Sequence, residues 1–305
     1  MTKALFIETS LKEDELNEEG KRRLNVSGVL RKLGVSRSGY NSWKKHLPST
    51  NKARKNRIKE LILEIYNESK QNYGAPKITK ILNKQGEKIS EKTVGNYMRE
   101  LGIKAQYIKP YTITTINSDI SSELINILDE QFNPDTPDAV WCSDITYIWT
   151  YEGFVYLTSI MDLYSRKIIS WVLSTTLESK WVIEAINKAK QARKSKQPKI
   201  IHSDRGCQYI SNEYINATVG MTRSYSRVAY PYDNACIEAF HAVLKREWLN
   251  RFKIFDYNHA YRLIFEYIDA FYNTTRIHSH CDYMSPDDYE HMYWTTLDKL
   301  ESKAS

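Results

Sequence analysis

The sequence predicts an α/β fold with a mixed five-stranded sheet and flanking helices, preceded by an all-α region. Strand-like runs at 140–149, 154–162 and 166–174 are rich in Val, Ile, Tyr, Trp and Thr and are separated by short turns. After them, helical and strand-like patterns alternate along the chain. Hairpin-joined strands followed by such alternation are typical of a layered α/β architecture with a mixed sheet. Before residue 105, the apolar residues recur with helical spacing only.

The N-terminal part of the chain predicts a first pair of short helices. Residues 1–22 are polar, and we expect them to form a flexible N-terminus. Residues 23–50 predict a helix-turn-helix-like segment, with Gly34 in the turn and Ser36 capping a second helix. The first helix would bury an apolar stripe of Val26, Val29, Leu30 and Leu33, and the second would bury Tyr40 and Trp43.

A second helix-turn-helix unit is expected over residues 55–105. Helical patterns at 57–70 and 76–84 precede a third helix, which Ser90 can cap. The apolar face of this third helix comprises Val94, Tyr97, Met98 and Leu101. Its other side shows Lys92, Thr93, Asn96 and Arg99. Because such side chains reach phosphates and base edges in a major groove, they are candidate DNA contacts. An ordinary helical bundle with a polar surface is the alternative.

The charge distribution favours nucleic-acid binding by the front half. Residues 1–115 contain 24 Lys and Arg against 12 Asp and Glu, whereas residues 116–305 contain 20 against 25. A basic region suits contacts with a phosphate backbone, although a solvated basic surface would look the same. No apolar run of about 18 residues predicts a membrane span. The four cysteines are widely spaced, which argues against a structural zinc site and for a reducing compartment.

The remaining segments complete the predicted order. We expect a linker at 106–135, a catalytic domain at 136–290 and a tail at 291–305. Within the catalytic domain, further helices are expected at about 178–195, 211–217, 238–250 and 257–274, and further strands at 199–203 and 222–227. An apolar stripe of Tyr261, Ile264, Ile268 and Phe271 would either cover the sheet or form a contact between subunits.

Three acidic residues stand out by their surroundings. Asp144 lies within a strand-like run, Asp204 ends another, and Glu238 opens a helical stretch, at separations of 60 and 34 residues. Taken singly, such residues are more often turn formers or helix-end charges. Together, carboxylates on two strands and a helix can converge to hold two divalent cations, as phosphoryl-transfer enzymes require. Lys245 shares a helical face with Glu238, and we expect it and Arg246 to contact DNA rather than only to offset the helix dipole.

The order of several short motifs resembles that of bacterial insertion-sequence transposases of the second-frame type, whose catalytic domain is similar to retroviral integrase. In the N-terminal half the motifs are Leu33-Gly-Val-Ser-Arg-Ser-Gly-Tyr-Asn-Ser-Trp43, Tyr73-Gly-Ala-Pro-Lys-Ile78 and Lys92-Thr-Val-Gly-Asn-Tyr-Met-Arg99. In the C-terminal half they are Trp141-Cys-Ser-Asp-Ile-Thr-Tyr147, His202-Ser-Asp-Arg-Gly-Cys-Gln-Tyr209, Tyr232-Asp-Asn-Ala-Cys-Ile-Glu238, Lys245-Arg-Glu247 and Phe271-Tyr-Asn-Thr-Thr-Arg276. The resemblance covers residues 25–290, and each motif is weak by itself.

The resemblance implies a ribonuclease-H-like fold, that of the integrase catalytic core. Asp144, Asp204 and Glu238 would be its catalytic residues and the ligands of two Mg²⁺ or Mn²⁺ ions. The implied activity is cleavage and joining of DNA strands at the ends of a mobile element, without ATP. The implied partners are double-stranded DNA, meaning terminal inverted repeats and target, further copies of the chain, and an upstream-frame protein. The implied location is the bacterial cytoplasm, at the nucleoid.

Two other functions fit parts of the pattern. A nuclease of the same fold would cut DNA without joining it, but two helix-turn-helix units favour an enzyme that recognises specific ends. A catalytically silent DNA-binding regulator would have no need for three acidic motifs.

Overall fold

A computed structural model describes residues 28, 30, 31, 34, 36–44, 50–106, 124–193, 198–228 and 230–304. The chain divides into two compact units, residues 1–61 and 62–305. The expected flexible segment 1–22 and most of the linker lie outside the described residues, as do Val26, Val29, Leu33 and the side chain of Trp43.

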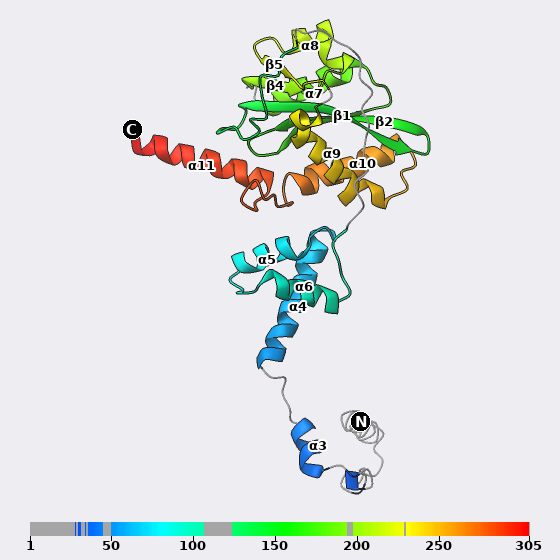
Figure 1. Cartoon of the computed structure of the whole chain (residues 1–305), viewed down its shortest axis with the longest axis vertical. Helices are drawn as coiled ribbons and strands as arrows, with labels where there is room; N and C mark the ends of the chain where they lie inside the picture. The colour runs from blue at the N-terminus through cyan, green and yellow to red at the C-terminus, as the bar shows by residue number, and fades with distance from the viewer. Residues whose placement is uncertain are drawn as a thin grey trace. The chain divides into compact units, whose positions relative to one another are not determined.

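The first unit contains helix α3 (Arg37–Lys44) and the start of α4 (Thr50–Glu68) (Figure 1). The Ser36 side chain accepts a hydrogen bond from the backbone N–H of Gly39 at 3.3 Å, as expected for the residue that caps α3. Leu30 and Tyr40 are buried, so the described part of the predicted first helix pair has apolar residues turned inward.

The second unit begins within α4 and continues into two further helices. These are α5 (Ala75–Lys84) and α6 (Glu91–Glu100), which pack against each other. Their buried side chains include Ile78, Leu82, Val94 and Met98. Ser90 caps α6 by accepting a hydrogen bond from the backbone N–H of Thr93, as the sequence predicts. Gly86 has a φ of +91° in the turn after α5, a conformation that favours glycine.

A five-stranded mixed sheet forms the centre of the second unit (Figure 1). Its strands are β1 (Val140–Thr150), β2 (Gly153–Asp162), β3 (Ile168–Ser174), β4 (Ile200–Ser203) and β5 (Thr222–Tyr225), in the spatial order β3-β2-β1-β4-β5. The pairs β1–β2 and β2–β3 are antiparallel, whereas β1–β4 and β4–β5 are parallel. The predicted hairpins and the mixed sheet are therefore both present.

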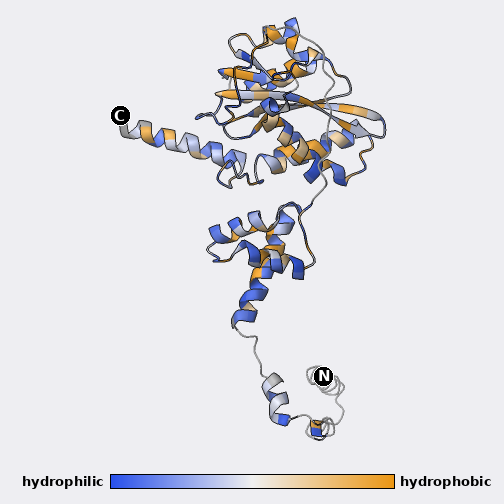
Figure 2. Cartoon of the chain, in the orientation of Figure 1, coloured by the Kyte–Doolittle hydropathy of each residue, from blue (hydrophilic) through white to orange (hydrophobic). Residues whose placement is uncertain are grey.

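Helices cover both faces of the sheet. On one face, α7 (Ser179–Ala192) packs its apolar side against β2 and β3, in a core shared with Trp141 and Ile160. On the other face, α9 (Ala235–Glu247) and α10 (Tyr257–Tyr267) contact β1. A short helix, α8 (Asn212–Ala217), packs on α7. Figure 2 shows hydrophobic residues concentrated in the strands and the helices that cover them.

Several element ends differ from the sequence expectation. The helix of Glu238 ends at Glu247 and is followed by a 3₁₀ turn, η3 (Leu249–Arg251). The helix expected at 257–274 is α10 followed by a π-helical turn, η4 (Ile268–Tyr272). The two other 3₁₀ turns of the described chain are η1 (Cys207–Ile210) and η2 (Pro231–Asn234). No described helix combines the length and apolarity that a membrane span requires.

The apolar stripe of the α10 segment belongs to the interior of the unit. Ile264, Ile268 and Phe271 are at most 2% exposed, and only Tyr261 is open to solvent, at 46%. The stripe therefore covers the sheet, and its buried residues are not available for a contact between subunits.

The last helix, α11 (Pro286–Ala304), runs through the expected boundary between residues 290 and 291. Its residue Glu290 accepts hydrogen bonds from the guanidinium of Arg193 and from Ser165. Arg193 also approaches Asp138 and Asp162 at 3.1 and 3.3 Å. This buried ion-pair cluster fixes the start of α11 against the end of α7.

Candidate active site

The strand register brings Asp144 and Asp204 together. In the parallel pair β1–β4, Ser143 lies opposite Ser203, and this is the last pair of the ladder. Asp144 and Asp204 are the next residues on the two neighbouring strands, where strands run about 4.8 Å apart. The sheet therefore sets two carboxylates side by side at the point where β4 ends.

The environment of Asp204 disfavours its negative charge. The pKa of the Asp204 carboxyl is raised to about 6, chiefly by burial and then by the charge of Asp144, while a hydrogen bond from the backbone N–H of Gly206 acts in the opposite direction. That N–H donates to Oδ1 of Asp204 at 2.9 Å. One carboxylate oxygen is thus held by the backbone, while burial and the charge of Asp144 disfavour the ionised form.

Glu238 lies in the first turn of α9 and interacts electrostatically with both aspartates. Burial, together with the charges of Asp144 and Asp204, raises the pKa of Glu238 to about 7. The structure thus brings the three predicted carboxylates into one electrostatic cluster. Among the described residues, however, no three His, Cys, Asp or Glu side chains are already arranged to hold a metal ion.

His241 connects α9 with β1, and the sequence reasoning missed it. One ring nitrogen, Nδ1, is 3.2 Å from Oδ2 of Asp144, and Nε2 is 3.2 Å from the hydroxyl of Ser159. Ser159 pairs directly with Asp144 across β1 and β2. Because His241 follows Glu238 by three positions, both lie on one face of α9. The available signal was this spacing, which turns His241 toward the strand that carries Asp144.

Two polar residues near the carboxylates have different surroundings. His202 is buried between the hydroxyls of Ser224 and Ser226, and burial lowers its pKa to about 4, so it is neutral and has a packing role. Asn234 precedes α9 and is 3% exposed. Neither polar atom of its side chain has a hydrogen-bond partner among the described residues, and the side chain does not cap the helix. A buried amide without partners is costly, so a polar ligand at the site would be favoured.

The chemistry of these side chains fits a divalent cation. All three carboxylates offer hard oxygen ligands, which Mg²⁺ and Mn²⁺ prefer. Burial and mutual repulsion raise the pKa of Asp204 and of Glu238, as expected for carboxyl groups held close together. A bound cation would offset that repulsion.

Lys245 is a cationic side chain that interacts electrostatically with this cluster. Its Nζ lies 4.5 Å from the centroid of the Tyr147 ring on β1. Burial lowers the pKa of the Lys245 amine, and the nearby Asp144 carboxylate opposes that change. Lys245 is therefore positioned between the carboxylates and the aromatic side of β1. Arg246 is partly buried and acts electrostatically on Lys77 instead.

The candidate DNA contacts of α6 lie on its outer side. Lys92 and Arg99 are exposed, whereas Thr93 and Asn96 are partly exposed. The guanidinium of Arg99 donates to the side-chain oxygen of Asn96 at 2.5 Å, and the hydroxyl of Thr93 lies 2.9 Å from that of Ser90. Among the described residues these four side chains are separate from the carboxylate cluster, on an element that has its own small core.

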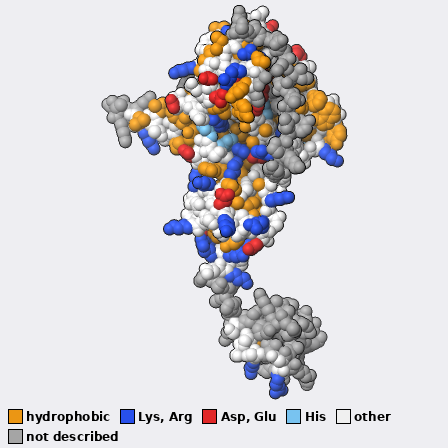
Figure 3. All heavy atoms as spheres, viewed as in Figure 1, with side chains coloured by type: hydrophobic (Ala, Val, Ile, Leu, Met, Phe, Trp, Pro, Cys, Tyr) orange, Lys and Arg blue, Asp and Glu red, His pale blue; other side chains and the backbone are white. Residues whose placement is uncertain are grey.

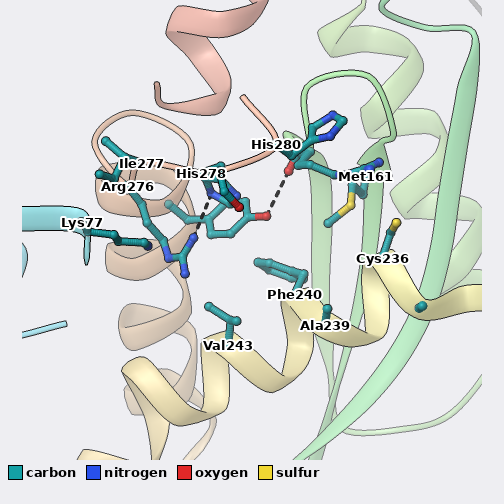
Figure 4. A pocket seen from close by; sticks show the side chains of 14 residues that line it. Lys77, Met161, Cys236, Ala239, Phe240, Val243, Arg276, Ile277, His278 and His280 are labelled. Atoms are coloured by element: carbon teal, nitrogen blue, oxygen red, sulfur yellow. Dashed lines mark hydrogen bonds between the residues drawn. The ribbon is translucent and has the colours of Figure 1, made fainter. Parts of the chain in front are cut away.

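A cavity of about 370 Å³ lies along α9 (Figure 4), and none of the three carboxylates lines it. It is lined by Ala239 and Val243 of α9 and by the cationic or imidazole side chains of Lys77, Arg276 and His278. Burial, with help from the charge of Arg276, lowers the pKa of Lys77 to about 7.

Polar groups around this cavity form hydrogen bonds within the protein. Arg276 makes two hydrogen bonds of 2.7 Å to the buried carboxylate of Glu247. The hydroxyl of Tyr73 accepts a hydrogen bond from the backbone N–H of Ile277 at 2.9 Å. The cavity therefore belongs to the contact between the α5 region and the segment after α10, not to the carboxylate site.

Comparison with protein families identifies both parts of the chain. One integrase core domain family matches residues 134–231, a second integrase core domain family matches 219–286, and an HTH-like domain family matches 53–111. The integrase core match and the five-stranded mixed sheet with its flanking helices show the expected ribonuclease-H-like fold.

Individual relatives extend over most of the chain. The transposase for insertion sequence element IS904 of Lactococcus lactis subsp. lactis (strain IL1403) is 36% identical, over 80% of this chain and 97% of that protein. Transposase InsF for insertion sequence IS3A of Escherichia coli (strain K12) is 31% identical, over 90% and 96%. The solved HTLV-2 integrase catalytic core domain in complex with magnesium is 16% identical over 51% of this chain and 97% of that domain, with a TM-score of 0.39. The chain belongs to the IS3-family insertion-sequence transposases, which are DNA-transposing enzymes of the polynucleotidyl-transferase type.

Proposed function

We propose that Asp144, Asp204 and Glu238 are the catalytic residues with which this transposase cleaves insertion-sequence ends and joins them to target DNA. The observation that carries the proposal is the strand register, which sets Asp144 beside Asp204 where β4 ends. Glu238 joins them on a helix that His241 ties to Asp144. The raised pKa of Asp204 and of Glu238 supports a site built for cations.

The three carboxylates would hold two Mg²⁺ or Mn²⁺ ions. Bound ions at such a site supply activation of an attacking hydroxyl and stabilisation of the leaving oxygen in phosphoryl transfer, with no need for ATP. The chain's own residues orient the ligands. The N–H of Gly206 holds one oxygen of Asp204, and His241 holds one oxygen of Asp144. Hydrogen bonds of this kind, from a neighbouring residue to a carboxylate that binds a metal, fix the orientation of that carboxylate.

Basic residues would place the DNA. Lys245 offers a positive charge beside the carboxylates for a phosphate near the scissile bond, and Arg246, on the side of α9 toward Lys77, would contact DNA away from that bond. End recognition belongs to α6, whose outer side carries Lys92 and Arg99. Because two ends must be joined, we infer that two or more copies act together on DNA, with an upstream-frame protein as a further candidate partner.

The decisive experiment incubates the purified chain with Mg²⁺ and linear DNA that carries the element's own ends. We expect cleavage and joining by the native chain, and neither reaction by Asp204→Asn, although that variant should still bind the ends. The exposed Asp135→Asn is the matched control, since it removes a carboxylate outside the cluster and should leave activity unchanged.

Other outcomes select the rival functions. Cutting without joining by the native chain would assign a nuclease, and binding without cutting would assign a silent regulator. Undiminished cleavage by Asp204→Asn would refute the assignment of the carboxylates.

A further inference from the structure

A groove follows the open edge of β1 beyond Asp144. Strand β4 pairs with residues 140–143 only, so among the described residues the stretch 144–150 has no strand partner on that side. The segment after α9 runs along this edge, where the N–H of Tyr151 donates to the carbonyl of Ile254 at 3.1 Å. Between β1 and this segment lies a cavity of about 520 Å³, lined among others by Tyr147, Trp149 and Phe252.

Aromatic side chains at this edge are unusually open to solvent. Tyr147 is 45% exposed, Trp149 61% and Tyr151 63%. Phe154, across the hairpin, makes edge contacts with the rings of Tyr147 and Trp149, with centroids 5.5 and 4.9 Å apart. Figure 3 shows hydrophobic side chains gathered over the end of the β1–β2 hairpin. These contacts hold the rings of Tyr147 and Trp149 in place and leave Trp149, the more exposed of the two, open to a partner.

The charge of the groove indicates an anionic partner. Lys245 and Lys253 line it, and none of the described residues that line it is acidic. Lys245 lies against the ring of Tyr147 and also interacts electrostatically with the carboxylate of Asp144, so this one side chain borders both the groove and the carboxylate site. Along an extended strand, Tyr147 and Trp149 are about 10 and 17 Å beyond Asp144. Aromatic faces alternating with cations are how proteins bind nucleotides that are not base-paired.

We propose that this groove binds unpaired nucleotides of the DNA strand that passes the carboxylate site, with bases stacked on Tyr147 and Trp149 and phosphates beside Lys245 and Lys253. The proposal rests on the proposed function, because it takes the carboxylates to be the place where the strand is cut. It adds that the element end is opened near the cut, and that the aromatic edge of β1 holds the opened bases.

The test compares two versions of the same element end, without divalent ions, so that no cleavage occurs. One version is fully paired, and the other has a short mismatched stretch beside the cut position. We expect Trp149→Ala to weaken binding of the mismatched end about tenfold relative to the paired end, since stacking on an aromatic ring is lost. Trp149→Phe should retain the preference. Phe265→Ala, which removes a 51% exposed aromatic side chain outside the groove, should change neither affinity.

A photocrosslink locates the bases directly. With 5-iododeoxyuridine in the mismatched stretch, we expect crosslinks at Tyr147 or Trp149 of the native chain. Crosslinks only to other elements, or equal losses on paired and mismatched ends in Trp149→Ala, would overturn the proposal. A change in sedimentation of the DNA-free Trp149→Ala protein, without a change in DNA binding, would instead assign the edge to a contact between copies. None of these measurements requires DNA cleavage, so their outcome does not depend on whether the carboxylates are catalytic.

Discussion

Replacing Asp204 by Asn should stabilise the metal-free protein at pH 8, although it removes a proposed catalytic residue. In the folded chain the pKa of Asp204 is about 6, above its ordinary value of 3.8, chiefly because of burial and then because of Asp144. For an acid with a raised folded pKa, the associated stability is present below about pH 4 and is lost as the pH rises to about 6. A difference of this size corresponds to at most about 3 kcal/mol at pH 8. Part of it is shared with the neighbouring carboxylates, so we expect a gain of about 1–3 kcal/mol.

The substitution is otherwise conservative. The side-chain oxygen of Asn can still accept the hydrogen bond that the N–H of Gly206 gives to Asp204. Loss of the negative charge also removes a repulsion on Glu238, because the charge of Asp204 raises the pKa of that residue. A gain of 1–3 kcal/mol corresponds to a melting temperature higher by about 2–10 °C in a domain of this size.

Thermal unfolding of both proteins, with and without Mg²⁺, tests this reasoning. In EDTA at pH 8 the Asp204→Asn protein should melt at the higher temperature, and the difference should vanish near pH 4. Added Mg²⁺ should stabilise the native chain, because a ligand that binds only the folded state adds its binding free energy to stability, and should stabilise the variant much less. A variant that melts lower in EDTA at pH 8, or that gains as much from Mg²⁺ as the native chain, would contradict the account.

Three further substitutions test other parts of the structure. Arg276→Ala removes the two hydrogen bonds that the guanidinium donates to the buried carboxylate of Glu247 and should lower the unfolding free energy by about 3–5 kcal/mol in urea titrations; a loss below 1 kcal/mol would show that the pair is not structural. Glu290→Ala removes the hydrogen bonds from Arg193 and Ser165 and should lower the unfolding free energy by about 3 kcal/mol. An unchanged midpoint of urea unfolding would contradict this expectation. Arg99→Ala should weaken end binding and reduce the slope of affinity against salt by about one ion, whereas an unchanged slope would place recognition outside α6.

Much of the fold followed from local patterns. The strands β1 to β3 are long, rich in β-branched and aromatic residues and joined by short turns, so their pairing as hairpins was predictable. Ser90 and the apolar face of α6 likewise predicted that helix, because a cap and a helical period are both local signals. The three acidic motifs could be placed on strands and a helix for the same reason.

Properties that depend on packing were not predictable. The contact of His241 with Asp144 needs the position of α9 over β1, which no local pattern specifies. The stripe of α10 has the same spacing whether it covers a sheet or a second subunit, and only the fold shows that Ile264 and Phe271 are buried. The open edge of β1 arises because β4 is short, a feature that becomes visible only when the two strands are paired.

The most direct test of the central proposal is a crystal structure of the chain with Mn²⁺ and uncleaved end DNA, in which anomalous scattering locates the ions. We predict Mn²⁺ bound by carboxylate oxygens of Asp144 and Asp204, with Glu238 drawn in as a further ligand and a DNA phosphate beside the ions. Ions bound elsewhere on the chain, or a DNA-bound complex in which Glu238 and the two aspartates stay without metal at saturating Mn²⁺, would contradict it.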